Sequence, residues 1–192
     1  MKSLALLFTT FIGASVCVTT SGTHKYTSAE RTVKRYAASL PAAGPTGAIN
    51  IVIDKSDYEL TVYDEKGWYA TYPVVFGNNS LADKKMEGDK NTPEGTFTIN
   101  AKRVHEKWCR FLAIDYPTAE SYEKFKQRKA SGQIPADAKI GGSIGIHGVW
   151  PREDFVIDKY KNWTLGCISM KNGEVTELYN FTKVGTRVVI RK

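Results

Sequence analysis

Apolar residues alternate with polar ones at every second position over much of the chain from residue 48 onward. Ile49, Ile51 and Ile53 fall on one side of the first such segment, and Leu60 and Val62 fall on one side of the next. This period of two is typical of half-buried β-strands. Similar apolar segments bounded by turn residues predict further strands over residues 68–76, 96–99, 110–116, 143–147 and 186–191.

Two later segments have apolar residues at the spacing of amphipathic helices. One covers residues 118–130, where Tyr122 and Phe125 share a face, and the other covers residues 172–182, with Asn172 as its expected N-cap. Strands joined by short turns, with only two or three short helices, are typical of an all-β domain. The pattern therefore predicts a mainly β fold, either an antiparallel β-sandwich or a barrel-like domain.

The chain of 192 residues is long enough for one domain with a buried core, and we assign this domain to residues 48–192. Residues 1–22 have a basic start followed by an apolar stretch, as in a secretory signal peptide that exports the protein to the periplasm or cell envelope. The apolar stretch is too short to predict stable insertion in a membrane. Residues 23–47 are expected to form a linker or a short N-terminal helix, since residues 27–40 have some helical character.

The composition is that of an ordinary globular protein, with 42% hydrophobic and 24% charged residues. The formal net charge is +7, but the lysines and arginines are scattered along the chain. Scattered charge does not predict nucleic-acid binding, which requires a concentrated basic surface. It fits attraction to an anionic polymer or a solvated surface.

Three cysteines occur, at Cys17, Cys109 and Cys167. Cys17 lies in the expected signal peptide, so the exported chain would keep two. Because a permanent disulfide would block a catalytic thiol, we predict that Cys109 and Cys167 are both free and that Cys109 packs in the fold. His24, His105 and His147 lack the spacing of metal ligands, so no metal site and no cofactor is predicted.

Cys167 and His147 are the candidate chemical pair. A neighbouring imidazolium would stabilise the cysteine thiolate, and the imidazole could later protonate a leaving amine. Gly166 would let a substrate carbonyl approach backbone N–H groups, and Gly148 would keep the wall beside the histidine open. A single cysteine next to Ile168 is also typical of a packed core. The glycine beside each member of the pair favours catalysis.

Four motifs in order resemble the L,D-transpeptidase (YkuD-type) catalytic domain family. They are the TPEG sequence at residues 92–95, the IHG sequence at 146–148, the TLGCIS sequence at 164–169 and the segment around Gly185. The resemblance extends over nearly all of residues 48–192. It implies a β-sandwich with a cleft at one edge, beside which residues 118–130 would lie as a lid. Packing of Tyr122 and Phe125 on the core is the alternative for this helix.

The resemblance also implies the reaction, which is acyl transfer on peptidoglycan stem peptides. Cys167 would attack the carbonyl between a diamino acid and a terminal D-alanine to form a thioester, with His147 as general acid/base. Gly166, Gly148, Thr164 and Trp163 would bind the oxyanion and the substrate. An amine acceptor would complete an L,D-transpeptidase reaction, whereas water would make the same site a carboxypeptidase or hydrolase. A non-catalytic cell-wall-binding module would need neither Cys167 nor His147.

The sequence departs from the family's commonest pattern on both sides of the nucleophile. That pattern has histidine two residues before the cysteine and arginine two residues after it, where this chain has Leu165 and Ser169. The missing arginine removes a bidentate partner for a substrate carboxylate. Lys171 or Arg152 is the candidate replacement. No third side chain that could orient His147 is evident in the sequence, so a backbone carbonyl is expected in that role.

Overall fold

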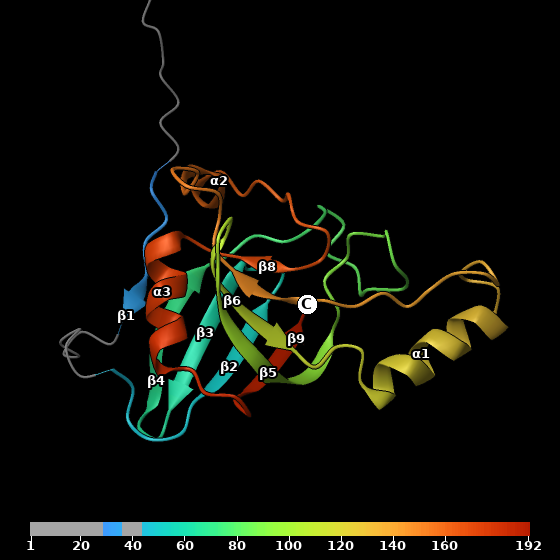
Figure 1. Ribbon diagram of the computed structural model, residues 1–192, viewed down its shortest axis with the longest axis horizontal. Helices are drawn as coiled ribbons and strands as arrows, with labels where there is room; N and C mark the ends of the chain where they lie inside the picture. Colours follow the sequence, from blue (N-terminus) through green and yellow to red (C-terminus); the bar gives the residue numbers. More distant parts are fainter. Residues whose placement is uncertain (1–28, 36–43) are drawn as a thin grey trace, which may run out of the picture.

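The computed structural model describes residues 29–35 and 44–192, which form nine strands and three helices (Figure 1). The expected signal peptide and Cys17 lie outside the described residues. The elements in chain order are β1 (Lys34–Arg35), β2 (Asn50–Asp54), β3 (Glu59–Asp64), β4 (Gly67–Pro73), β5 (Gly95–His105), β6 (Cys109–Ile114), α1 (Ala119–Ala130), β7 (Gly145–His147), α2 (Phe155–Asp158), β8 (Ile168–Ser169), α3 (Asn172–Phe181) and β9 (Arg187–Arg191).

The strands are hydrogen-bonded in the order β1-β4-β3-β2-β9-β5-β6-β7-β8. The long strand β5 joins the two halves of this arrangement: Gly95–Thr98 pairs with β9, and the part from Ile99 onward pairs with β6 after a bulge. The mainly β fold is therefore confirmed. Most neighbouring pairs are antiparallel, as predicted, but β2 pairs with β9 and β7 pairs with β8 in parallel.

The core lies between the two halves and is covered at one side by α3 (Figure 1). The expected alternation is confirmed at Ile51, Ile53, Leu60 and Val62, which are all fully buried. They belong to one cluster with side chains of β5 to β8 and α3. Burial of each such side chain contributes about 1.5–3 kcal/mol to the free energy of folding. This shared core fixes β7, which carries His147, and β8, which directly follows Cys167, against the rest of the sheet.

The residues before the domain, for which a linker or a short helix was expected, are extended over the part described, residues 29–35. Lys34 and Arg35 form β1 instead, paired with Thr71 and Ala70 at the open edge of β4. An edge strand offers unpaired backbone groups, and a passing extended segment satisfies them. We call residues 29–35 the arm.

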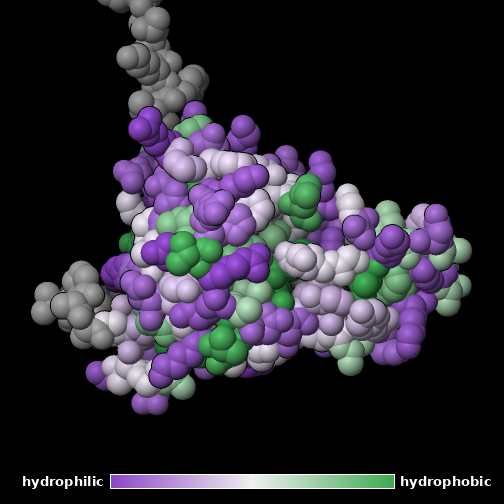
Figure 2. All heavy atoms as spheres, viewed as in Figure 1, coloured by the Kyte–Doolittle hydropathy of each residue, from purple (hydrophilic) through white to green (hydrophobic). Residues whose placement is uncertain are grey.

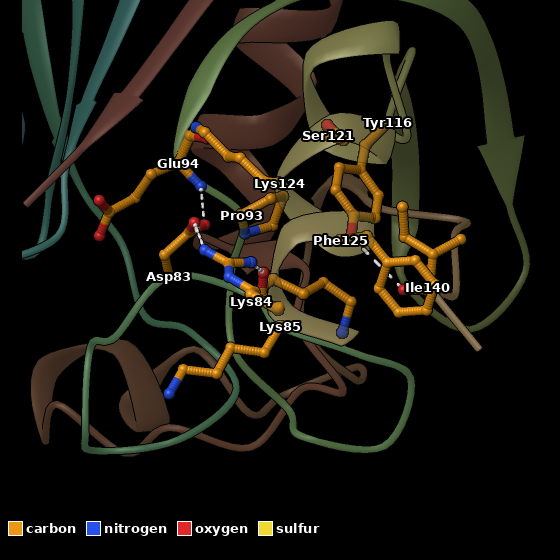
Figure 3. Close-up of a pocket in the computed structure, with 11 residues that line it drawn as sticks. Asp83, Lys84, Lys85, Pro93, Glu94, Tyr116, Ser121, Lys124, Phe125 and Ile140 are labelled. Carbon is orange, nitrogen blue, oxygen red and sulfur yellow. Dashed lines mark hydrogen bonds and ion pairs between the residues drawn. The ribbon is translucent and has the colours of Figure 1, made fainter. Parts of the chain in front are cut away.

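Helix α1 differs from its expected packing. Thr118 does cap it, because its Oγ1 accepts a hydrogen bond from the Ser121 N–H, but none of its residues is buried and Tyr122 is 47% exposed. The helix projects from the side of the sheet (Figure 1). Figure 3 shows the narrow pocket where the helix meets the loop over residues 77–94. At this junction Arg128 Nη2 lies 2.6 Å from Asp83 Oδ2. Polar contacts help to attach this helix, since half of its residues are charged.

Hydrophobic residues on the face in view occur as separate patches among hydrophilic ones (Figure 2). Among the described residues, no helix combines the length and apolar content needed to cross a membrane.

Candidate functional site

Cys167 lies in a turn immediately before β8, and Thr164 holds that turn together. The Thr164 Oγ1 accepts a hydrogen bond from the Gly166 N–H at 3.1 Å and donates one to the Cys167 carbonyl oxygen at 2.7 Å. The backbone N–H groups of Trp163 and Thr164 both donate to the Phe76 carbonyl oxygen. The cysteine is therefore presented by a backbone whose polar groups are largely satisfied.

The turn requires glycine at position 166 for a reason that differs from the expected one. The φ of Gly166 is +126°, a conformation that favours glycine, and a Cβ there would lie 2.7 Å from the Asn91 carbonyl oxygen. The glycine thus allows the turn to pack against the loop over residues 77–94, rather than opening space for a substrate. Its N–H is already bonded to Thr164, so it is not the free donor that the sequence suggested.

His147 ends β7, in register with Phe111 of β6 and Ser169 of β8. Its Nδ1 lies 2.6 Å from the Gly148 carbonyl oxygen, and its side chain is 2% exposed. Since a carbonyl can only accept, Nδ1 carries the proton and Nε2 is left as the basic nitrogen. The expected orienting carbonyl is present and belongs to the next residue.

Aromatic rings surround the imidazole on several sides. Trp108 and Phe111 stack on it with ring centroids at 4.6 Å and 5.9 Å, and Trp163 meets it edge-on at 5.6 Å. Neither Trp108 nor Phe111 was predicted from the sequence as part of the site. The signal that could have found them is the β6–β7 register, which sets Phe111 opposite His147. That register is a long-range pairing and cannot be read from periodicity alone.

Cys167 and His147 do not form the thiolate–imidazolium pair that was expected from the sequence. Burial lowers the pKa of His147 from its ordinary value of 6.5 to about 4, and burial raises the pKa of the Cys167 thiol. Both groups are therefore neutral near pH 7, because a low-dielectric site disfavours their charged forms. The thiol lies 3.5 Å from the Ser143 carbonyl oxygen, which suits a protonated sulfur. The imidazole is therefore a neutral ring near pH 7 and not a preformed imidazolium.

One pocket contains both members of the candidate pair. It has a volume of about 330 Å³, and its lining includes Arg103, Trp108, Phe111, Gly142, Ser143, Ile144, His147, Trp163, Thr164, Leu165 and Cys167. The sequence-based candidates Trp163 and Thr164 are thus in the lining, whereas Gly166 and Gly148 are not. None of the α1 residues lines it, so the helix does not cover this pocket as a lid. Cys109 and Cys167 are both free, as predicted.

Gly148 packs tightly and does not leave an open wall. A Cβ on it would lie 2.1 Å from Asn172 Oδ1 and 2.9 Å from the Trp108 carbonyl oxygen. Asn172 is the first residue of α3 and not its cap: its Oδ1 accepts a hydrogen bond from the Val149 N–H, and the cap position is held by Lys171. The asparagine side chain therefore braces the strand end that carries His147.

Neither suggested replacement for the missing arginine reaches the pocket. Lys171 Nζ is bonded to the Arg31 carbonyl oxygen at 2.7 Å and to Asp158 Oδ1 at 2.9 Å, and Arg152 is absent from the lining. Ser169 is fully buried and donates to the Gly148 carbonyl oxygen, whereas Leu165 is 75% exposed at the rim. Within the part of the chain that the structure describes, Arg103 is the cationic side chain of the lining.

Comparison with known proteins agrees with the fold. The chain is 29% identical over 144 residues to the Bacillus subtilis (strain 168) protein named "Putative L,D-transpeptidase YqjB", an alignment that covers 73% of this chain and 69% of that protein. The fold of this chain is similar to that of the helical cell shape determining protein Pgp2 from Campylobacter jejuni, with a TM-score of 0.55 and 21% identity. The alignment covers 76% of this chain and 48% of that chain. The fold is also similar to that of Bd1075 from Bdellovibrio bacteriovorus, with a TM-score of 0.52, 18% identity and the same coverage.

The chain spans about half the length of those two solved chains, so the likeness concerns one domain of each. Residues 49–190 match the YkuD family, described as L,D-transpeptidase catalytic domain. This match covers most of the chain and includes every residue of the pocket lining. The chain therefore belongs to the YkuD family of L,D-transpeptidase catalytic domains.

Proposed function

We propose that this protein is a peptidoglycan L,D-transpeptidase in which Cys167 forms a thioester with a stem peptide. The observation that carries the proposal is that Cys167 and His147 line one pocket while Gly148 fixes the imidazole tautomer. A neutral thiol beside a neutral imidazole with a free Nε2 is the starting state for general-base attack. Export to the cell envelope, where peptidoglycan lies, belongs to the same proposal.

In the first half-reaction, His147 Nε2 takes the proton of the Cys167 thiol as sulfur bonds to the carbonyl carbon between the diamino acid and D-alanine. The resulting oxyanion needs backbone donors. Because the Gly166 N–H is engaged by Thr164, we assign this role to the Cys167 N–H. The imidazolium then protonates the D-alanine nitrogen, the C–N bond breaks, and a thioester and free D-alanine remain.

In the second half-reaction, the neutral His147 takes a proton from an acceptor amine as that amine attacks the thioester carbonyl. Collapse of the intermediate returns the proton to sulfur, regenerates the thiol and leaves an amide cross-link. Water in place of the amine would give a trimmed stem, which is the carboxypeptidase or hydrolase alternative. The low pKa of His147 keeps the imidazole unprotonated near pH 7, which is the form that a general base must have.

Incubation of the mature protein with purified sacculi, followed by muropeptide analysis, tests the proposal. We expect released D-alanine and new cross-links with the wild type, and a loss of at least about a thousandfold in D-alanine release with Cys167→Ala. Cys109→Ala is the matched control, since Cys109 is a free thiol outside the pocket.

Each other outcome of this experiment has a defined meaning. Trimmed stems without cross-links would assign the hydrolase reaction and overturn the transferase. Unchanged muropeptides with wall-bound protein would favour the non-catalytic binding module. D-alanine release by Cys167→Ala at the wild-type rate would remove the thioester from the mechanism.

A further inference from the structure

The pocket around Cys167 holds side-chain hydrogen-bond donors that have no acceptor. The indole Nε1–H groups of Trp108 and Trp163 are both buried, and neither has a partner among the described residues. Both indoles are part of the pocket lining. Buried donors normally find an acceptor, because an unpaired one forfeits its hydration. Both donors belong to side chains that line one cavity, so a group bound there could supply their acceptor once the rings turn to expose their nitrogens.

Arg103 adds a positive charge to the same pocket. Its guanidinium Cζ lies 4.4 Å from the ring centre of Phe111, which in turn stacks on His147. No carboxylate among the described residues forms an ion pair with it, in contrast to Arg35, Arg128 and Arg191. Stacking on an aromatic ring holds a guanidinium in place and leaves its N–H groups available.

We propose that Arg103, Trp108 and Trp163 form the subsite that binds a carboxylate of the donor peptide. A carboxylate only accepts hydrogen bonds, and these three side chains only donate them. The subsite would replace the bidentate partner that is missing at Ser169, and it rests on the proposed function. Two carboxylates of the donor could occupy it: that of the terminal D-alanine and that of the diamino acid side chain.

Steady-state release of D-alanine from a tetrapeptide tests the role of Arg103 in the reaction. We expect Arg103→Gln to raise KM about tenfold or more with a smaller change in kcat, and Arg103→Lys to restore part of the loss. Arg152→Gln is the matched control, because it removes an arginine of the same domain that does not line the pocket. An unchanged KM for Arg103→Gln would overturn the proposal.

Two amidated peptides identify the source of the carboxylate. One carries an amide in place of the D-alanine carboxylate, and the other carries an amide on the diamino acid side chain. Amidation of the recognised carboxylate should remove the benefit of Arg103. The peptide that has lost this group should therefore bind to the wild type no more tightly than to Arg103→Gln. If both amides retain the full sensitivity to Arg103→Gln, neither carboxylate occupies the subsite and the proposal is wrong.

Alkylation of Cys167 tests the subsite without any turnover. Iodoacetate and iodoacetamide react at the same carbon, but only iodoacetate carries a carboxylate. We expect the ratio of their rates at Cys167, measured by mass spectrometry at low salt, to fall about fivefold in Arg103→Gln and to fall less in Trp108→Phe and Trp163→Phe. Arg152→Gln should keep the wild-type ratio.

The kinetics of D-alanine release and the ratio of alkylation rates together separate failure of the subsite from failure of the proposed function. A ratio that falls in a protein without activity on stem peptides would support the subsite and overturn the proposed reaction. D-alanine release with an unchanged ratio and an unchanged KM in Arg103→Gln would support the reaction and overturn the subsite. Thermal melting of each variant shows whether the fold is intact.

Discussion

Two groups of charged and aromatic side chains in this protein differ in whether their hydrogen-bond donors find acceptors within the chain. One is the pocket around Cys167, where the indole N–H groups of Trp108 and Trp163 lack partners. The other, which we call the arm socket, is where Arg31 of the arm meets α2 and the start of α3. There the Arg31 guanidinium donates to three backbone carbonyl oxygens, and its Cζ lies 3.9 Å from the Tyr160 ring centre.

Lys171 and Asp158 complete the arm socket. Lys171 Nζ contacts the Arg31 carbonyl oxygen and Asp158 Oδ1, and Asp158 also accepts from the Arg31 N–H at 2.7 Å. The charged donors of the arm socket are thus satisfied from within the chain, and such a group stabilises structure. The indole donors of the pocket are not, and the proposed carboxylate would satisfy them. The two groups, both built of charged and aromatic residues, thus differ in how many of their hydrogen-bond donors find an acceptor within the chain.

The largest effect on stability is expected from the arm socket. Lys171→Met should lower the free energy of unfolding by about 3 kcal/mol, because it leaves the buried Asp158 carboxylate with less compensation. Urea unfolding measures this loss. The rate of Cys167 alkylation by iodoacetamide in the folded protein should not change. Lys159→Met, at an exposed neighbour, is the control; a loss below about 1 kcal/mol in Lys171→Met would place the arm socket among weak surface contacts.

The second prediction uses pH, because each region holds a buried titrating group. Burial lowers the pKa of His147 to about 4, so its neutral form stabilises the fold fully above pH 6.5, and this contribution is lost as pH falls toward 4. Burial raises the pKa of Glu174, beside the arm socket, to about 7. Its neutral form stabilises the fold below pH 4.5, and that contribution is lost as pH rises through 7.

Urea unfolding at a series of pH values separates the two groups. Relative to the wild type, His147→Gln should gain stability as pH falls from 6.5 to 4, and Glu174→Gln should gain stability as pH rises from 4.5 to 7. Each change should reach about 2 kcal/mol, less than the full shift would give, because neither site is sealed from solvent. Parallel curves for a variant and the wild type would show that its residue does not titrate in that range.

The same two regions show how far the sequence could predict the molecule. Alternation identified Ile51 and Leu60 as buried, because a strand with one face on the core forces a period of two. The motifs identified Cys167 and His147, since the glycine beside each of them can be read locally in the sequence. Local patterns therefore gave the main strands and the two residues of the candidate pair.

What failed depends on contacts between distant segments. Trp108 and Phe111 reach His147 only through the register of β6 with β7, and Gly148 is explained only by Asn172, which lies 24 positions later in the chain. Lys171 lies near the nucleophile in the sequence, but its Nζ donates a hydrogen bond to the Arg31 carbonyl oxygen of the arm. Long-range register and charge pairing are set by the whole fold, so a local pattern cannot supply them.

The smallest effect is expected inside the pocket, at a polar group that is satisfied. Thr164→Val keeps the shape of the side chain but removes the oxygen that bonds the Gly166 N–H and the Cys167 carbonyl. The loss in unfolding free energy should be about 1–2 kcal/mol, the cost of leaving buried backbone groups unpaired. Thr164→Ser keeps the oxygen and should remain within about 0.5 kcal/mol of the wild type. Iodoacetamide should label Cys167 at a different rate in the valine variant only, because the turn that presents the sulfur loses its brace; equal rates in all three proteins would show that the brace does not position the thiol.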